Sequence, residues 1–291
     1  MRAPISFEKR YVYQPLPDSD PSADEGKDSQ NGSVAVYRAL DKQLDRVVCV
    51  KQVNVPGKDE RTKKANMEKA ISEVRLLAKA GEMNLRIPAI YDFYIDARGG
   101  VLYIFMELIK GGTLREHMKE PKRVLSYMID LCDILHELDR IHIHHKDIKP
   151  ENLMISQKGE LWLIDFNISG SLPNMEEGTR FYKAPEMGAG THHADRSRSD
   201  MFSIGVILYE AFTGELPREG IFYTADAFDS KQEKWKKFRE AIEVGPDVPP
   251  AVNEIITKCM SRQPRDRYRN YGDLKRALER ADRQMRKTGK A

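Results

Sequence analysis

The residues best suited to chemistry lie in one polar stretch and at one acidic position shortly after it. Residues 145–152 contain Asp147, Lys149 and Asn152, and Asp165 follows within a run of apolar residues. Carboxylate and amide oxygens are hard ligands that suit Mg²⁺, and a lysine adds a cation. Phosphoryl transfer depends mostly on positioning and charge stabilisation, and it needs these residue types. The stretch could therefore support phosphoryl transfer.

Both segments resemble motifs of one known family. Residues 145–152 read His-Lys-Asp-Ile-Lys-Pro-Glu-Asn, and residues 162–166 read Trp-Leu-Ile-Asp-Phe. They are similar to the catalytic loop and the metal-binding turn of eukaryotic-type (Hanks-type) Ser/Thr protein kinases. A polar surface loop before a buried strand is the plain alternative, but the order and spacing of the two segments favour the resemblance.

The resemblance implies a role for each of these polar residues. Asp147 would act as the base that orients the acceptor hydroxyl, and Lys149 would stabilise the phosphoryl group in transfer. Asn152 and Asp165 would bind Mg²⁺, and ATP would be the phosphate donor. The implied reaction moves the ATP γ-phosphate to a hydroxyl of a protein substrate.

The N-terminal part would supply a lysine and a carboxylate. The Val-Cys-Val-Lys run that ends at Lys51 is similar to the third-strand lysine motif of the family, which implies that Lys51 contacts the α- and β-phosphates. Residues 59–80 have apolar residues at helical spacing, and this helix is expected to hold a carboxylate against the lysine. Glu73 is preferred because Leu77 lies one turn later on the same side, and Glu68 is the fallback. The plain alternative is that both glutamates are solvated.

The phosphate-covering loop departs from the family pattern. The three positions where glycines are expected hold Ser29, Asn31 and Val34, and only Gly32 is present. Glycines let a backbone approach phosphates closely and adopt positive φ. Their absence, within the acidic segment 17–33, predicts an atypical phosphate loop.

The adenine end of the ATP site follows from the same resemblance. Residues 107–109 are similar to the hinge whose backbone groups bind adenine, and Met106 falls at the position that gates the back of the site. The cofactor-binding residues so implied are Val36, Cys49, Lys51, Met106, Glu107, Ile109, Asn152, Met154 and Asp165.

A third motif concerns the acceptor. Residues 178–186 (Gly-Thr-Arg-Phe-Tyr-Lys-Ala-Pro-Glu) resemble the substrate-docking loop of protein kinases. By that resemblance, Lys149 together with Thr179 favours serine or threonine acceptors over tyrosine. Autophosphorylation at Ser169, Ser171 or Thr179 stays open, because these hydroxyls are present but little else in the segment marks them.

Two further positions are expected to be structural. Asp200 resembles the family's anchor for the backbone of the catalytic loop, with a plain helix cap as the alternative. Arg267 stands where the family pairs an arginine with the carboxylate of Glu186. Such a buried pair is costly to break on one side only.

Composition excludes several classes of function. The 291 residues are 40% hydrophobic, which is ample for a core, and the net charge of +3 argues against nucleic acid binding by bulk electrostatics. No apolar run reaches the ~18 residues of a membrane span. Cys49, Cys132 and Cys259 lie far apart, which indicates a reduced, cytoplasmic protein without a disulfide framework or zinc site.

The expected fold is a single α+β protein kinase domain over residues 1–291. Residues 1–108 would form a lobe with a small antiparallel sheet and one key helix, and residues 109–291 a larger, mainly helical lobe. A short first strand is allowed within 6–16, further strands are expected at 33–40, 46–55, 88–93 and 100–106, and helices at 59–80, 124–138, 201–212 and 271–287.

Two other functions stay open. A pseudokinase that binds nucleotide without turnover is suggested by the missing glycines and by Asn167, where the family's metal-binding turn has glycine. Against it, the full set of charged and metal-binding residues is present, and a scaffold has no chemical need for that set. A small-molecule kinase of the same fold is the other alternative, and the docking loop at 178–186 argues against it. The Pro-x-x-Arg-Tyr pattern at 264–268 and the compact size resemble those of bacterial members of the family.

Overall fold

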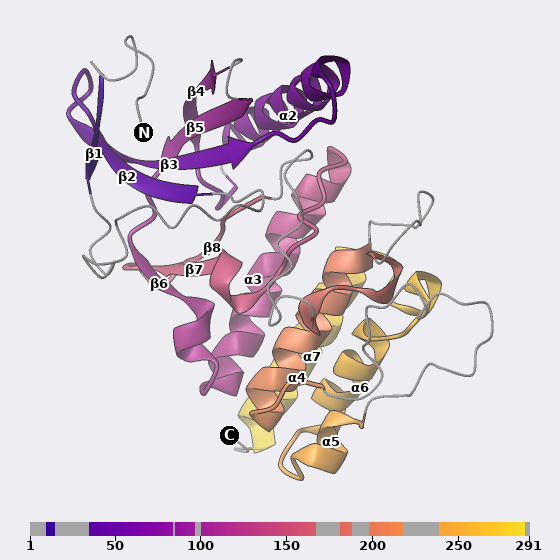
Figure 1. The fold of residues 1–291 in the computed structure, drawn as a ribbon. Helices are drawn as coiled ribbons and strands as arrows, with labels where there is room; N and C mark the ends of the chain where they lie inside the picture. The colour runs from indigo at the N-terminus through magenta and orange to yellow at the C-terminus, as the bar shows by residue number, and fades with distance from the viewer. Residues whose placement is uncertain are drawn as a thin grey trace. The chain divides into compact units, whose positions relative to one another are not determined.

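The computed structural model describes residues 10–14, 35–83, 85–96, 100–166, 181–187, 198–217 and 239–288. The described residues up to Lys110 form one compact unit, and those from Gly111 onward form a second. The first unit is an antiparallel sheet with one long helix, and the second is mainly helical (Figure 1). The expected α+β fold class is confirmed, and the boundary expected after residue 108 stays a prediction.

Five strands form the sheet of the first unit. Their bounds are β1 Tyr11–Gln14, β2 Ala35–Asp41, β3 Arg46–Asn54, β4 Ile90–Asp96 and β5 Val101–Glu107. The order across the sheet is β1-β2-β3-β5-β4, and all neighbouring strands are antiparallel. The short turn at residues 42–45 joins β2 to β3, with Asp45 in the left-handed conformation that aspartate tolerates.

One face of this sheet carries an apolar cluster. Because side chains alternate along a strand, Val48 and Val50 of β3 lie on the same face as Tyr103 and Phe105 of β5. The ring of Tyr11 stacks on that of Phe105 with centroids 4.0 Å apart, which brings β1 into the cluster. Residues one position along β3 therefore point to the opposite face.

A partly buried ion pair joins the residue before β1 to the end of β2. The Asp41 carboxylate, with 0% exposure, accepts hydrogen bonds from Arg10 Nε at 3.0 Å and Arg10 Nη2 at 2.9 Å. Gln43 N donates a third hydrogen bond at 3.1 Å. The hydrogen-bonded Arg10 guanidinium holds the pKa of Asp41 below its ordinary value, although burial acts in the opposite direction.

This pair predicts an acid-dependent contribution to stability. Because the folded-state pKa is lowered, Asp41 stabilises the fold fully above the ordinary carboxyl value of about 4, and the contribution is lost as pH falls through the lower folded value. Asp41→Asn should therefore lower the free energy of unfolding by about 1–3 kcal/mol at neutral pH and by much less in acid. Urea unfolding at pH 7 and at the lowest pH where both proteins fold checks this. An equal loss at both values would contradict it.

The helix of the first unit, α2 (Glu60–Gly81), begins where its sequence predicts. The Asp59 side chain caps the N-terminus by accepting a hydrogen bond from Thr62 N at 2.7 Å. Apolar residues then recur every three to four positions and form the buried stripe, and α2 packs beside β4. The buried residues are Met67, Ala70, Val74, Leu77 and Ala80.

The described part of the second unit contains five α-helices. Their bounds are α3 Pro121–Arg140, α4 Ser199–Thr213, α5 Ala241–Val244, α6 Pro250–Cys259 and α7 Tyr271–Thr288. α3 lies beside α4 and α7, and α6 lies beside the same two helices (Figure 1). α4 is buried on nearly all sides, which accounts for its apolar sequence. Within the described ranges, no helix combines the length and the apolar character needed to cross a bilayer.

A small sheet in the second unit holds the candidate catalytic segments. β6 (Gly111–Thr113), β7 (Leu153–Ser156) and β8 (Leu161–Leu163) pair antiparallel in that order. β7 begins directly after the 3-10 turn Pro150–Asn152, and Asp165 follows two residues after β8. Because β7 and β8 are antiparallel neighbours, the start of β7 lies beside the end of β8. The two polar segments therefore lie at the same end of these strands.

The observed elements agree with the expected ones in type and differ at their ends. β2 and β3 end within two residues of the expected strands, whereas β4 extends to Asp96, three residues beyond the expectation. α3 begins three residues earlier than expected, with Pro121 in its first turn, where a missing N–H costs nothing. β6, β7, β8 and α6 have no counterpart among the expected elements.

Candidate active site

In the first unit, strand register places four predicted nucleotide-binding residues on one face of the sheet. Val36 of β2 lies directly opposite Lys51 of β3, and Cys49 of β3 lies opposite Met106 of β5. Cross-strand partners share a face, and so do residues two apart on one strand. The four side chains therefore form one strip, on the face opposite to the apolar cluster. Lys51 is only 6% exposed, whereas Val36 is 45% exposed.

The burial of α2 distinguishes its two candidate glutamates. Glu73 is half-buried, three residues after buried Ala70 and four before buried Leu77, whereas Glu68 is exposed. A buried lysine needs an anionic partner to offset its desolvation. Burial therefore favours Glu73 over Glu68 as the partner of Lys51, and the pairing itself stays a prediction.

The remaining predicted nucleotide positions are half-buried. Glu107, at the end of β5, donates a hydrogen bond from its backbone N–H to Ala89 O at 2.8 Å, and its side chain accepts one from Ala89 N at 3.3 Å. Ile109 follows just before the start of the second unit. Met154 lies in β7 of the second unit, opposite Trp162. The structure places these residues, and their roles toward a nucleotide stay predictions.

In the second unit, Asp200 anchors the backbone of the catalytic loop. Its two carboxylate oxygens accept hydrogen bonds from His145 N at 3.0 Å and Lys146 N at 2.9 Å. Burial raises the pKa of Asp200 above its ordinary value, while electrostatic interaction with His145 and the two backbone hydrogen bonds oppose that rise. The anchoring contact expected from the sequence is therefore confirmed.

His145 links the catalytic loop to the segment that carries Asp165. Its Nε2 lies 2.8 Å from Ile164 O, and its ring lies 4.7 Å from the ring of Phe166. Ile164 N also donates to Asn152 O at 2.9 Å. These contacts hold Ile164 and Phe166, the neighbours of Asp165, against the loop that carries Asn152, so the two predicted metal ligands belong to adjoining segments.

Two residues of these adjoining segments adopt the left-handed backbone conformation. Lys146 has φ 65° and Asp165 has φ 61°. Such conformations cost a non-glycine residue about 1–3 kcal/mol and persist only where surrounding contacts impose them. The hydrogen bond that Lys146 N donates to Asp200 is one such contact, and the two strained positions are the neighbour of Asp147 and the predicted metal ligand Asp165.

The carboxylate of Asp147 is surrounded by cations and by one amide. Lys149 Nζ lies 3.7 Å from Oδ2 and Lys183 Nζ lies 4.0 Å from Oδ1. Asn152 Nδ2 donates to Oδ2 at 3.2 Å. The structure therefore brings together Asp147, Lys149 and Asn152 as the sequence predicted, and it adds Lys183, which the sequence did not single out.

The amide of Asn152 has a determined orientation. Its Nδ2 donates both to Asp147 O at 2.8 Å and to Asp147 Oδ2, and both partners can only accept hydrogen bonds. The nitrogen must therefore face Asp147, which leaves the amide oxygen on the other side. An amide oxygen so directed, together with the Asp165 carboxylate, is a donor set that fits Mg²⁺.

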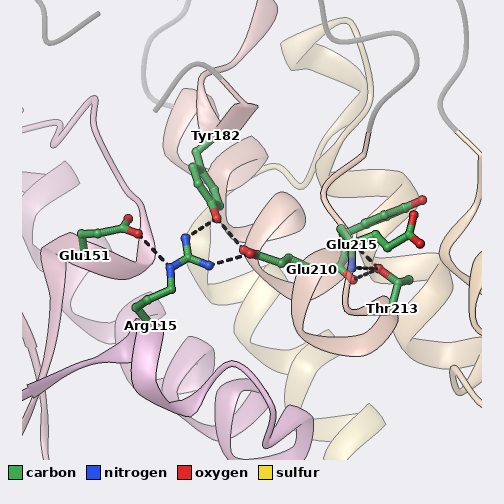
Figure 2. A network of polar contacts seen from close by, with 7 residues as sticks. Arg115, Glu151, Tyr182, Glu210, Thr213 and Glu215 are labelled. Atoms are coloured by element: carbon green, nitrogen blue, oxygen red, sulfur yellow. Dashed lines mark hydrogen bonds and ion pairs between the residues drawn. The ribbon is translucent and has the colours of Figure 1, made fainter. Parts of the chain in front are cut away.

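Figure 2 shows a polar network that sequence reasoning missed. Arg115, in the 3-10 turn Leu114–His117, donates to Glu151 Oε1 at 2.8 Å, to Glu210 Oε1 at 2.5 Å and to Tyr182 OH at 2.7 Å. Tyr182 OH in turn donates to Glu210 Oε2. Burial, and then this hydrogen bond, raise the pKa of Tyr182 well above its ordinary value, so the phenol stays protonated and donates.

The network joins the docking loop to three other elements. Tyr182 belongs to the predicted docking loop, Glu151 to the catalytic loop, and Glu210 to α4. The sequence offered one clue to it, because Glu210 is a lone carboxylate within the apolar run of α4 and needs a partner when it is half-buried. No spacing rule, however, connects residues this distant in the chain.

The expected pair of Glu186 and Arg267 is confirmed. Arg267 Nη1 and Nη2 donate to the two carboxylate oxygens of Glu186 at 2.6 and 2.8 Å. Ser199 Oγ donates to the same carboxylate at 3.1 Å. Arg267 and Glu186 are 3% and 6% exposed, so the pair is held inside the second unit. The pair fixes the end of the docking loop.

Several predicted positions lie outside the described residues. They include the atypical phosphate loop at 17–33, Asn167, and the hydroxyl residues Ser169, Ser171 and Thr179.

Comparison with known proteins agrees with this geometry. Residues 30–278 match the protein kinase domain family. The serine/threonine-protein kinase PknL of Mycobacterium tuberculosis is 32% identical over 258 residues, which cover 84% of this chain and 61% of that protein. The serine/threonine-protein kinase PrkC of Bacillus subtilis is 28% identical over 264 residues, which cover 86% of this chain and 39% of that protein.

A probable serine/threonine-protein kinase of Streptomyces coelicolor is 29% identical over 268 residues, covering 86% of this chain and 38% of that protein. This chain thus spans less than two thirds of the length of each of these relatives. The family match includes both polar segments and the strand that carries Lys51. The chain belongs to the protein kinase domain family.

Proposed function

We propose that this chain is an ATP-dependent protein kinase that phosphorylates serine or threonine residues of a protein substrate. The observation that carries the proposal is the environment of the Asp147 carboxylate. It accepts a hydrogen bond from Asn152 Nδ2 at 3.2 Å, and Lys149 Nζ lies 3.7 Å away. The relatives named above, serine/threonine-protein kinases by name, support the same activity. Three described cysteines that form no disulfide fit a reducing cytoplasm.

The chain's own residues would divide the work of the transfer. Asp147 orients the acceptor hydroxyl and takes its proton as the new O–P bond forms, and the bond from the γ-phosphorus to the bridging oxygen breaks to release ADP. Lys149 offsets the negative charge on the group in transfer. Bound Mg-ATP supplies the phosphoryl group, with Asn152 and Asp165 as the residues that would hold the metal. Asp200 positions the loop that carries the base.

The strip of side chains on the first unit's sheet would serve nucleotide binding. Lys51 supplies a buried cation for the α- and β-phosphates, and Glu73 orients it. The other residues that we assign to ATP are Val36, Cys49, Met106, Glu107, Ile109 and Met154.

The choice between the two glutamates of α2 can be tested directly. Glu73→Gln should lower kcat/KM for ATP by about tenfold or more, because a buried lysine without its carboxylate is poorly positioned. Glu68→Gln is the matched control, and it should leave kcat/KM unchanged because Glu68 is exposed. Steady-state kinetics at varied ATP with both variants decides the matter. A larger loss for Glu68→Gln would reverse the assignment.

Incorporation of labelled γ-phosphate from Mg-ATP tests the proposed activity. The purified chain is incubated with labelled Mg-ATP and a generic protein substrate, and the labelled amino acid is identified. Phosphoserine or phosphothreonine in the substrate supports the proposal, and label in the chain itself would show autophosphorylation. ATP binding without any label would favour a nucleotide-binding scaffold, and transfer only to a small alcohol would favour a small-molecule kinase.

A further inference from the structure

Arg38 of β2 is a charged residue on the predicted nucleotide face that the proposed function does not use. It lies two residues after Val36 on the same strand and directly opposite Cys49 of β3. Residues two apart on a strand share a face, and so do cross-strand partners. Arg38 therefore extends the strip of side chains that carries Lys51, on the face opposite to the apolar cluster.

The Arg38 side chain has no polar partner among the described residues. The side chain is half-buried, and its Nε is buried without a hydrogen bond. Its two terminal nitrogens keep some exposure, so a ligand can reach them. A cation that is partly removed from water without a partner carries an uncompensated cost in free energy. Such a group is suited to bind a ligand that offers acceptor atoms or the face of a ring.

The place of Arg38 within the strip indicates the nucleoside half of a nucleotide. Arg38, Cys49 and Met106 form one row across β2, β3 and β5, because each is the register partner of the next. Glu107, at the predicted hinge for adenine, directly follows Met106. Lys51, the predicted phosphate contact, lies in the neighbouring row, about 6.6–6.8 Å away along the strand. Arg38 therefore shares its row with the adenine end of the strip.

A guanidinium can make two kinds of contact with a nucleoside. Its flat face stacks on a purine ring, and its N–H groups donate to ring nitrogens or ribose oxygens. Side chains stand roughly perpendicular to a sheet, so Arg38 would meet a base from the same side as Val36 and Cys49. That approach presents the face of the base, which favours stacking. A lysine at this position would supply the charge without the flat surface.

We propose that Arg38 is a further nucleotide-binding residue that holds the nucleoside half of ATP by stacking its guanidinium on the purine base. The inference rests on the proposed kinase function and adds a binding residue to the same site. Because the contact involves the base, it contributes equally to the binding of adenosine, ADP and ATP. A contact with the phosphates would instead contribute more as the negative charge of the ligand increases.

Binding of adenosine, ADP and ATP, measured by isothermal titration calorimetry at one Mg²⁺ concentration, tests the inference. Arg38→Met keeps an unbranched apolar stem and removes the guanidinium. Its Kd should rise about three- to tenfold, by the same factor for all three ligands. Arg38→Lys keeps the charge but not the flat face, so it should restore only part of the affinity. Arg75→Met, at an exposed arginine of α2, is the matched control and should leave all three Kd values unchanged.

Thermal unfolding without nucleotide separates a binding role from a structural one. Because the Arg38 guanidinium has no polar partner among the described residues, Arg38→Met should keep or raise the thermal midpoint of the unchanged chain. A midpoint well below that of Arg75→Met would show that Arg38 stabilises the fold, and the inference would be overturned.

The binding data have equally distinct outcomes. A loss of affinity that grows from adenosine to ATP would assign Arg38 to the phosphates, and unchanged affinity in Arg38→Met would give it no part in binding. Either result overturns the inference, and so does an unchanged chain that binds ATP but not adenosine. If the unchanged chain binds none of the three ligands, the proposed function fails as well. If the expected pattern of binding is found but no phosphate is transferred, the proposed function fails while the role of Arg38 in binding stands.

Discussion

Asp147→Asn is expected to lower the rate of phosphoryl transfer by about 10²–10⁴-fold, the usual contribution of a positioned general base. Asparagine has nearly the same size, and its amide oxygen can still accept the Asn152 hydrogen bond that Asp147 Oδ2 accepts now. It cannot take a proton from an acceptor hydroxyl, and it no longer offsets the charges of Lys149 and Lys183. The loss should therefore appear in kcat, while ATP affinity and the thermal midpoint stay close to those of the unchanged chain.

A matched substitution separates this effect from a general loss of charge. Asp133→Asn removes an exposed carboxylate of α3 that pairs with Lys275, 2.7 Å away. An exposed pair of this kind contributes at most about 1 kcal/mol, so transfer should be unchanged. Single-turnover transfer of labelled phosphate, with ATP binding measured beside it, compares the three proteins. Asp147→Asn with undiminished transfer would remove Asp147 as the base and leave the site without an assigned one.

The sequence was most informative where chemistry fixes both residue type and spacing. The segment 145–152 and Asp165 could be read as one site from the family resemblance, and the structure gives the physical reason, because β7 and β8, which they flank, are adjacent in the sheet. The anchoring carboxylate of Asp200 and the pair of Glu186 with Arg267 also follow from the resemblance. Each of these residues makes several contacts that only its residue type can make. The sequence motif therefore predicts the contact, which overall composition could not do.

The short strands of the second unit were not predicted. β6 and β8 have three residues each and β7 has four, too few to show alternation between polar and apolar residues. The ends of longer strands shifted for a related reason. β4 continues to Asp96 because Asp96 pairs with Val101 of β5. The end of a strand thus depends on its partner strand, which the local sequence of β4 does not show.

The contacts of the site that link distant parts of the chain also escaped the sequence. Arg115 contacts Tyr182 and Glu210 across 67 and 95 residues. Lys183 reaches Asp147 in a similar way, because the docking loop folds back on the catalytic loop. A single sequence does not show which distant residues come together in the fold, so these contacts could not be predicted from it.

Loss of Arg267 is expected to have the largest effect on stability. Arg267→Ala should lower the free energy of unfolding by about 3–5 kcal/mol, because it leaves the carboxylate of Glu186 buried without its cation. The arginine side chain has 0% exposure, and it also donates to Arg198 O at 3.0 Å and Ser261 O at 3.0 Å. These carbonyls would lose their donor as well, so the loss exceeds that of one ion pair.

Arg265 provides the matched control only two residues away. It is 84% exposed, and its nearest carboxylate, Asp266, lies 4.0 Å away, so Arg265→Ala should cost less than about 0.5 kcal/mol. Urea unfolding gives the free energy of unfolding of both single variants and of the double variant Arg267→Met and Glu186→Gln. Their comparison measures the contribution of the buried pair. The double variant should be more stable than Arg267→Ala, because no buried charge is then left without a partner. If Arg267→Ala and Arg265→Ala cost the same, the buried pair does not stabilise the docking loop. If the double variant is instead the least stable, the attraction within the pair outweighs the cost of burying its charges.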